Sequence, residues 1–558
     1  MAASSPPSAP KVLVIGLDGA TWDIARPLMA QGRLPNLARL TADGAAGPLA
    51  STVPPISAAA WVTFLTGQNP GRHGVYQFRK MDLRRYGGYR DEFAASHDYR
   101  GRSLVERVGQ HGRRVAAVGV PMTYPPFPVN GFLVSGFPRP FGPQAPVYPP
   151  EMAARLGRWD AMPDAFNFSL SPAKTVEASA YWTRRYTDIA LAALAEGIYD
   201  LVMVVWNHTD TIPHLYWRYT DPTFPAYDPR GAQRFGRVIA QQYELADAEI
   251  GRLLAALPDD NTLVLAMSDH GMGPFPHRRA HLNVWLAEHG WLRLRPAAGR
   301  RPHPFNRAVS TVRQRLPTQW RHRLRDRLPA SWRARLFARQ LDLDRVDWLR
   351  TQAYRLAVFP TVEGIVVNLR GRQAQGIVSP GAEYEAVRDA ILAGLAALRD
   401  PDTGQPIVRR AARREELFAG PHLDEIPDIL VELRDSYTGG PALSGPLVTP
   451  VPMAELRRHS ATHRPDGLFV LHGPGVRRGV WVEGASIADL APTLLHAMGL
   501  PVAADMDGRV LHEALEPAWQ RPVVLAEYGL AASGNGHRLS AAEEDAIRRQ
   551  LAGLGYLS

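Results

Sequence analysis

Cysteine is absent from the 558 residues of the chain. Its absence excludes disulfide bonds, zinc sites built from thiolates and cysteine nucleophiles. Any metal ion that the protein binds must therefore be held by histidine and carboxylate side chains.

Long apolar runs are absent as well. No uninterrupted apolar stretch reaches the length of about 18 residues that marks a membrane-spanning helix, and no basic region precedes a signal-like apolar stretch at the amino terminus. We therefore expect a cytoplasmic protein. Hydrophobic residues make up 45% of the chain and charged residues 21%, a composition that predicts a folded globular protein.

Lysine is scarce, and the positive charge is local. Only Lys11, Lys80 and Lys174 are lysines, so 61 of the 64 basic residues are arginine, which indicates coding bias rather than selection for phosphate contacts. Residues 291–340 hold fourteen arginines and one acid, Asp326, for a net charge of +13, whereas the rest of the chain sums to −3. The overall charge of +10 is thus no argument for a nucleic-acid partner.

The arginine-rich segment has a helical pattern of its own. Phe305, Val309 and Val312 recur at helical spacing, and Pro317 and Pro329 interrupt the pattern. We predict an inserted helical cap of two or three short amphipathic helices over residues 291–345. Three roles stay open for it: a solvated basic face, a lid that touches an anionic substrate, or a surface that docks on an anionic membrane or protein.

Short, continuously apolar runs alternate with helical segments along the rest of the chain. Such runs are typical of strands that are covered on both faces, and the alternation predicts an α/β fold with a largely parallel central sheet. Helices are predicted in "YWTRRYTDIALAALAEG" and "GRVIAQQYELADAEIGRLLAAL". The apolar runs begin at Lys11, Arg113, Tyr199, Asn261, Asp428 and Gly467.

The length of the chain predicts a large core with inserted subdomains, or two to four domains. The capping-box pair Ser540 and Glu543 predicts a closing helix. We divide the chain into a first core part at residues 1–290, which includes a Pro-, Gly- and Tyr-rich excursion at about 76–180, the cap at 291–345, a second core part at 346–515, and a C-terminal tail and helix at 516–558.

Carboxylates and imidazoles follow three of the predicted strands. Asp18 ends the first, Asp210 and His214 follow the third in "WNHTDTIPH", and Asp269 and His270 follow the fourth in "VLAMSDHGMG". Taken singly, Asp18 could be a turn residue and His214 a packed histidine. The carboxyl ends of parallel strands lie along one edge of a sheet, however, and carboxylates that converge there repel one another unless cations are present.

A pair of metal ions resolves this repulsion. A site of Asp and His without Cys suits Zn²⁺, with Mn²⁺ as the alternative, and two ions need about six protein ligands. His463, just before an apolar run in "SATHRPDGLFVLHGPG", is the natural sixth ligand. His459 and His472 compete for that place.

Ser57 is the candidate nucleophile. It follows the Pro-rich turn "STVPPI" and opens a helix of small residues, where free backbone N–H groups favour an anion. The alternative is that Ser57 only caps the helix.

These motifs resemble, in order, those of the alkaline phosphatase superfamily, in the type I phosphodiesterase and nucleotide pyrophosphatase branch in its prokaryotic form. The resemblance rests on "VIGLDGATWD", "PPISAAAWVTFLTGQNPGRHG", Asp210 with His214, "SDHGM" and "THRPDG", and it extends over most of the chain. It implies an alkaline-phosphatase-like three-layer fold and a metal-dependent phosphoester hydrolase. The implied first metal site is Asp210, His214 and His463, and the second is Asp18, Asp269 and His270 with the nucleophile Ser57.

Two departures from the family pattern bear on the substrate. Ala58 and its neighbours stand just after the nucleophile, where eukaryotic members place an Asn some way on, and Ser57 stands where Thr is commoner. No sulfatase nucleophile motif, P-loop or Gly-x-Ser-x-Gly elbow occurs. Besides a phosphodiesterase, a phosphomonoesterase, phosphonate hydrolase or phosphomutase on the same metal core stays open, as does a non-catalytic metal-stabilised binding protein.

A preference for diesters follows from charge. A monoester dianion carries one more negative charge than a diester, and an arginine beside the nucleophile would favour it. Between Val53 and Thr66 there is no Arg, Lys, Asn or Gln. The expected substrate is a small anionic phosphodiester or nucleotide pyrophosphate, although an arginine from the cap could reverse the preference.

Overall fold

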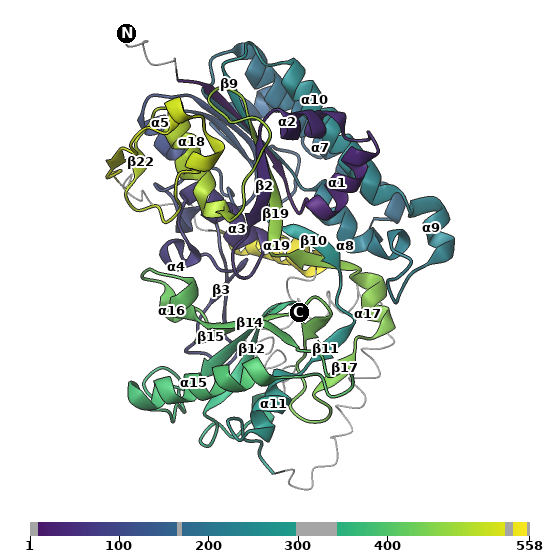
Figure 1. Cartoon of the computed structure of the whole chain (residues 1–558), viewed down its shortest axis with the longest axis vertical. Helices are drawn as coiled ribbons and strands as arrows, with labels where there is room; N and C mark the ends of the chain where they lie inside the picture. The colour runs from purple at the N-terminus through teal and green to yellow at the C-terminus, as the bar shows by residue number, and fades with distance from the viewer. Residues whose placement is uncertain (1–8, 165–169, 297–342, 530–538, 555–558) are drawn as a thin grey trace.

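The computed structural model describes residues 9–164, 170–296, 343–529 and 539–554 (Figure 1). The predicted arginine-rich cap falls almost wholly on residues 297–342, outside the described residues. Figure 1 shows an upper lobe built on a large twisted sheet and a lower lobe built on a smaller sheet. In the described part, no helix is long and apolar enough to cross a membrane.

The central sheet has ten strands and is largely parallel, as predicted. Its path runs β20-β2-β19-β9-β1-β8-β5-β6-β7, and antiparallel pairing is confined to β19 with its two neighbours and to β7. The strands are β1 (Lys11–Leu17), β2 (Ala45–Ala50), β5 (Val115–Val120), β6 (Gly131–Ser135), β7 (Val147–Tyr148), β8 (Leu201–Trp206), β9 (Thr262–Met267), β19 (Asp466–His472), β20 (Val480–Trp481) and β21 (Ala485–Ser486), which pairs with β2.

Helices cover both faces of this sheet, which gives the predicted three layers. Within β1, Val12 and Val14 belong to one hydrophobic cluster and Leu13 and Ile15 to the other, because successive side chains of a strand point to opposite faces. This explains why the strand is apolar without interruption. One face packs against α1 (Trp22–Ala30), α2 (Pro35–Ala42), α7 (Pro172–Glu196), α8 (His208–Thr220) and α10 (Val238–Ala255), and the other against α3 (Ser57–Thr66), α5 (Leu104–Gln110) and α18 (Leu490–Ala497).

The lower lobe contains a second, antiparallel sheet of four strands in the order β12-β13-β15-β14. The apolar run at Asp428 is a strand, as predicted, but it belongs to this sheet rather than to the central one. Its hydrophobic side chains continue the cluster that begins on the α3 face of the central sheet. The elements are β12 (Ala353–Phe359), β13 (Val362–Val367), β14 (Val408–Arg413), β15 (Ile429–Leu433), α11 (Leu282–Glu288) and α15 (Ala382–Ala397).

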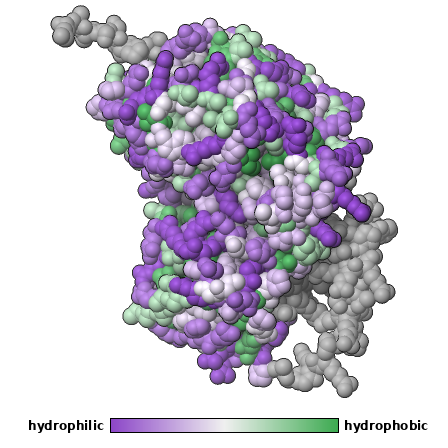
Figure 2. All heavy atoms as spheres, turned by 45° about the vertical axis from the view of Figure 1, so that its right-hand side comes forward, coloured by the Kyte–Doolittle hydropathy of each residue, from purple (hydrophilic) through white to green (hydrophobic). Residues whose placement is uncertain are grey.

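Two further features complete the fold. The Pro-, Gly- and Tyr-rich stretch at 76–180 contributes β5, β6 and β7 to the central sheet, so it is part of the core. The closing helix is α19 (Ala541–Leu554), and Ser540 and Glu543 form the expected reciprocal bonds at its start. Figure 2 shows a mainly hydrophilic surface over the face turned toward the viewer.

Candidate metal centre and nucleophile

The predicted site residues lie at the carboxyl edge of the central sheet. Asp18 follows β1, and Asp269 and His270 follow β9. Asp210 and His214 are four residues apart in α8, so they share one helix face directly after β8. All seven candidates, Ser57 and His463 included, are at most 8% exposed.

His463 reaches the edge by a route that does not use the central sheet. It lies in β18 (Ala461–Arg464), which pairs antiparallel with β10 (Gly271–Pro274) and places His463 opposite Met272. Because β10 directly follows the Asp269–His270 pair, this short ribbon brings His463 to the ends of β9 and α8.

One ligand group is formed by Asp210, His214 and His463. The Asp210 Oδ1 atom lies 3.2 Å from the Nε2 atom of each histidine, and the two Nε2 atoms lie 3.1 Å apart. All three residues are buried, and one ligand atom of each lies within 4.8 Å of those of the other two. This arrangement is what a metal ion with nitrogen and oxygen ligands requires.

A second group surrounds His270. Its Nε2 atom lies 3.3 Å from Asp269 Oδ2, 3.6 Å from Asp18 Oδ1 and 3.2 Å from Ser57 Oγ. Asp210 also comes within metal-ligand reach of Asp18 and His270, so it lies between the two groups. The glycine after Asp18 permits this approach, because a Cβ atom at Gly19 would lie 2.9 Å from the Cβ atom of Asp210.

The hydrogen bonds of the three histidines indicate which nitrogen of each ring carries the proton and which carries the lone pair. Each Nδ1 atom lies near a backbone carbonyl: His214 at 3.0 Å from Ala461, His270 at 3.0 Å from Gly271, and His463 at 2.7 Å from Pro55. When Nδ1 donates its proton to a carbonyl, the Nε2 atom of a neutral ring carries a lone pair. All three lone pairs then face carboxylates and one another, which is the orientation of metal-binding histidines.

Each carboxylate of the site keeps one oxygen that receives no hydrogen bond. Asp18 Oδ1, Asp210 Oδ1 and Asp269 Oδ2 are buried without a hydrogen-bond partner. Burial raises the pKa of Asp18 well above its usual range, and the charges of Asp269 and Asp210 raise it further. Burial also raises the pKa of Asp269 to about 8 and lowers the pKa of His463 to about 3, which keeps that ring neutral. The donor set and its orphaned oxygens therefore fit bound cations.

The raised pKa of Asp269 predicts how the metal-free protein responds to pH. A carboxyl with a pKa of about 3.9 in the unfolded chain and about 8 in the folded chain binds its proton more tightly when folded. Its stabilising contribution is complete below pH 4 and is lost as the pH rises toward 8. With chelator present, the free energy of unfolding should fall over this range by more for the unaltered protein than for Asp269→Asn, as measured by urea denaturation. Equal pH profiles would contradict this expectation.

Ser57 is the first residue of α3, and Ile56 occupies the N-cap position. The capping interpretation of Ser57 is therefore wrong. The side chain instead points its Oγ atom at His270, 3.2 Å from Nε2. The first N–H groups of a helix have no partner within it, and a helix start of this kind suits a negatively charged group.

The two competing histidines lie elsewhere. His472 pairs with Val264 near the start of β9, away from the site at the end of that strand. His459 is the C-cap residue of α17 (Met453–Arg458), beside Ser460, whose N–H donates to the His214 carbonyl at 2.8 Å. Neither histidine joins a metal-ligand group among the described residues.

Two contributors to the site escaped the sequence analysis. Asn207 donates its side-chain amide to Asp18 Oδ2 at 2.6 Å, and Thr209 donates its hydroxyl to the Asp18 carbonyl at 2.7 Å. Both lie in "WNHTD", directly after β8, where their place at a strand end was the only available signal. Together they hold Asp18 in position beside the start of α8.

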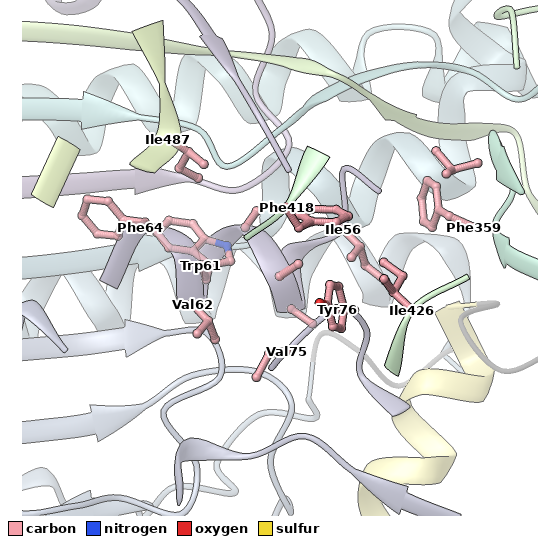
Figure 3. Close-up of a cluster of buried hydrophobic side chains, with 14 of the residues drawn as sticks. Ile56, Trp61, Val62, Phe64, Val75, Tyr76, Phe359, Phe418, Ile426 and Ile487 are labelled. Atoms are coloured by element: carbon pink, nitrogen blue, oxygen red, sulfur yellow. The ribbon is translucent and has the colours of Figure 1, made fainter. Parts of the chain in front are cut away.

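The second lobe contributes an apolar wall. The Phe359 ring, at the end of β12, lies 5.0 Å from the ring of His463. Figure 3 shows Phe359 on one side of a group of side chains that includes Ile56, Phe418 and Ile426. Since Ile56 precedes the nucleophile, the surroundings of Ser57 on this side are apolar.

Comparison with known proteins agrees with the geometry. The family model for type I phosphodiesterase / nucleotide pyrophosphatase matches residues 12–441. The chain belongs to this family. It is thus a phosphoester hydrolase, and both the resemblance to this family and the fold class read from the sequence are confirmed. His463 lies beyond the matched range, and the β10–β18 ribbon connects it to the site.

Solved structures resemble the chain over most of its length. Human ectonucleotide pyrophosphatase / phosphodiesterase 5 is 14% identical, with 91% of this chain and 100% of that chain covered and a TM-score of 0.45. Phosphonoacetate hydrolase from Sinorhizobium meliloti 1021, in complex with phosphonoacetate, is 15% identical, with 89% and 99% covered and a TM-score of 0.48. A search of curated proteins found no match.

Proposed function

We propose that this family member is a phosphodiesterase or nucleotide pyrophosphatase with two metal ions and Ser57 as its nucleophile. The observation that carries the proposal is the position of Ser57 Oγ, 3.2 Å from His270 Nε2 and beside buried carboxylate oxygens that have no partner. Binding alone does not require a nucleophilic hydroxyl beside the metal ligands.

The residues present divide into two ligand sets. Asp210, His214 and His463 would hold one ion, and Asp18, Asp269 and His270, with Ser57, the other. Asp210 lies within reach of both sets. We expect Zn²⁺, with Mn²⁺ as the alternative. When bound, such ions neutralise the negative charge that builds up on the phosphoryl oxygens during displacement.

Ser57 carries the covalent chemistry in this proposal. Its Oγ atom attacks phosphorus, and the bond from phosphorus to the leaving oxygen breaks as the Oγ–P bond forms. The proton that Ser57 loses balances the one that the leaving alkoxide gains. Water then attacks phosphorus, the Oγ–P bond breaks as the new O–P bond forms, and the phosphate monoester leaves while a proton from the water returns to Ser57 Oγ. The start of α3 supports the first step because its free N–H groups face the developing negative charge.

A direct assay separates this proposal from a metal-stabilised binding protein. Turnover of bis-p-nitrophenyl phosphate should appear with added Zn²⁺ or Mn²⁺ and disappear in a chelated control. Absence of turnover with every divalent metal and with both diester and monoester substrates would favour the binding protein. Phosphonoacetate and a phosphomutase substrate should be tested in the same assay, because phosphonate hydrolases and phosphomutases use the same kind of two-metal site.

The surroundings of Ser57 predict a preference for diesters. The helix that it begins is buried along its whole length and carries no charged residue, and Ile56, Phe359 and Ile426 form the apolar wall nearby. No arginine of α3 therefore compensates the extra charge of a monoester. The kcat/KM for bis-p-nitrophenyl phosphate should exceed that for p-nitrophenyl phosphate. A monoester preference of about tenfold, or roughly 1.4 kcal/mol, would instead favour a phosphatase or mutase.

A further inference from the structure

The β10–β18 ribbon supports both histidines of the Asp210 group. β18 carries His463, and the carbonyl of Ala461 in the same strand lies 3.0 Å from Nδ1 of His214. A shift of β18 would therefore move one ligand and the hydrogen-bond partner of another. Each strand of the ribbon has only four residues. Because so short a pair of strands is marginally stable by itself, other contacts must hold it in place.

Arg464 supplies such contacts. It directly follows His463 in β18, so its side chain lies on the opposite face of the ribbon from the metal ligands. The side chain is 14% exposed. Its Nη2 atom donates to the carbonyl of Pro274 in β10 at 2.7 Å, and its Nη1 atom donates to the carbonyl of His463 at 3.3 Å. The guanidinium thus joins the two strands, and one of its bonds goes to the peptide group of a metal ligand.

Gly273 makes room for this guanidinium. Arg464 pairs with Gly271, and Gly273 comes two residues later on the same face of β10. A Cβ atom at Gly273 would lie 2.7 Å from Nε and 2.9 Å from Cζ of Arg464. The backbone of Gly273 belongs to a strand and does not have a positive φ, so its conformation does not require glycine. The space that Arg464 occupies explains the glycine instead.

An ion pair also connects Arg464 with the second lobe. Its Nε atom lies 3.7 Å from Oδ1 of Asp435, which follows β15, and Arg409 of β14 donates to the same carboxylate. The side chain of Asp435 is 57% exposed, and ion pairs that are so open to water contribute little. The two bonds to carbonyls are therefore the contacts of Arg464 that matter for the ribbon.

We propose that Arg464 is a positioning residue for metal binding, which holds β18 so that His463 and His214 face Asp210. The proposal rests on the two-metal centre of the proposed function. It implies an asymmetry between the two ions. Two of the three ligands in the Asp210 group depend on β18, whereas the carboxylates of the other group directly follow β1 and β9 of the central sheet.

The experiment follows the release of Zn²⁺ from the loaded, full-length protein to an excess of a chromogenic chelator. Two ions in different sites should leave in two phases. Arg464→Met keeps an apolar stem without a donor, and it should accelerate one phase about tenfold, an effect typical of residues that support metal ligands. That phase should be the one that His463→Ala lacks. Arg464→Lys can still donate to one carbonyl and should show an intermediate rate.

Gly273→Ala tests the same contact from the other strand. Its Cβ atom would displace the guanidinium, so the variant should reproduce the effect of Arg464→Met. The double variant should release Zn²⁺ no faster than either single variant, because both changes remove one and the same contact. Gly273→Ala also decides the matter if Arg464→Met fails to fold.

Arg409→Gln is the matched control, because Arg409 also contacts Asp435 but lies in β14, outside the ribbon. It should release both ions at the rates of the unaltered protein. Unchanged release in Arg464→Met, equal acceleration of both phases, or additive effects in the double variant would overturn the proposal and leave the proposed function intact. An unaltered protein that binds no metal would instead refute the two-metal centre, and this proposal with it.

Discussion

Ser57→Ala is expected to lower kcat/KM by at least about a thousandfold, or about 4 kcal/mol of transition-state stabilisation. The variant removes the Oγ atom that lies 3.2 Å from His270 Nε2, and with it the covalent route. The measurement is steady-state turnover of bis-p-nitrophenyl phosphate with saturating metal. Metal content should stay near two ions per chain, because the carboxylates and histidines remain.

The effect on folding should be small, which separates a catalytic from a structural role. Ile56, not Ser57, is the N-cap residue of α3, so the variant does not forfeit the usual capping energy of about 1 kcal/mol. Urea denaturation should show a free energy of unfolding within about 0.5 kcal/mol of the unaltered protein.

Two further variants serve as controls for Ser57→Ala. Ser57→Thr keeps a hydroxyl and should retain far more activity than the alanine variant. Ser51→Ala removes a serine from the same approach to α3, at a residue whose N–H donates to the Pro465 carbonyl, and should leave turnover unchanged. Near-normal turnover of Ser57→Ala would remove Ser57 from the mechanism.

The sequence was sufficient to predict the framework of the site because the relevant signals are local. The strands before these residues are apolar because both faces are covered, and Asp18, Asp210, Asp269 and His270 stand within four residues of a strand end. His214 follows Asp210 by four residues on the same face of α8. The carboxyl ends of parallel strands meet at one edge of the sheet, so these residues come together independently of the conformation of the connecting loops. The predicted grouping of carboxylates and histidines follows from this rule.

Other parts of the site depend on contacts between distant segments, and no local pattern encodes them. Asp210 lies within reach of both ligand groups because Gly19 allows a close approach, which sequence spacing cannot show. Phe359 reaches His463 only because the second sheet docks on the α3 face of the core. The sequence pattern did not separate the run at Asp428 from the strands of the central sheet, since β15 reads ILVEL and is nearly as apolar as they are.

The sequence motif favoured His463 over His459 and His472 as the sixth metal ligand. The geometry of the site gives a physical reason for this preference. His459 precedes β18 by two residues and His472 ends β19 beside the start of β9, whereas His463 faces Asp210 at 3.2 Å. The carbonyl of Pro55, in the turn before Ser57, receives its Nδ1–H at 2.7 Å. The Pro-rich turn thus serves both the nucleophile and a metal ligand.

His463→Ala is expected to remove one of two metal ions and at least about a thousandfold of activity. The variant deletes one residue of the Asp210, His214 and His463 group, whereas Asp18 and Asp269, which lie beside His270, keep their side chains. Elemental analysis after metal loading should therefore give about one ion per chain, against about two for the unaltered protein.

His459→Ala and His472→Ala are the matched controls, because each removes a histidine from the same part of the chain without touching a ligand group. Both should keep two ions and nearly full turnover. The unaltered protein must itself show close to two equivalents of Zn or Mn, since three buried carboxylate oxygens without partners need that much positive charge. Less than half an equivalent after supplementation would refute the metal centre. Loss of an ion in His459→Ala with none lost in His463→Ala would instead move the sixth ligand to His459, and the β10–β18 pairing that places His463 beside Asp210 would then have to change in solution.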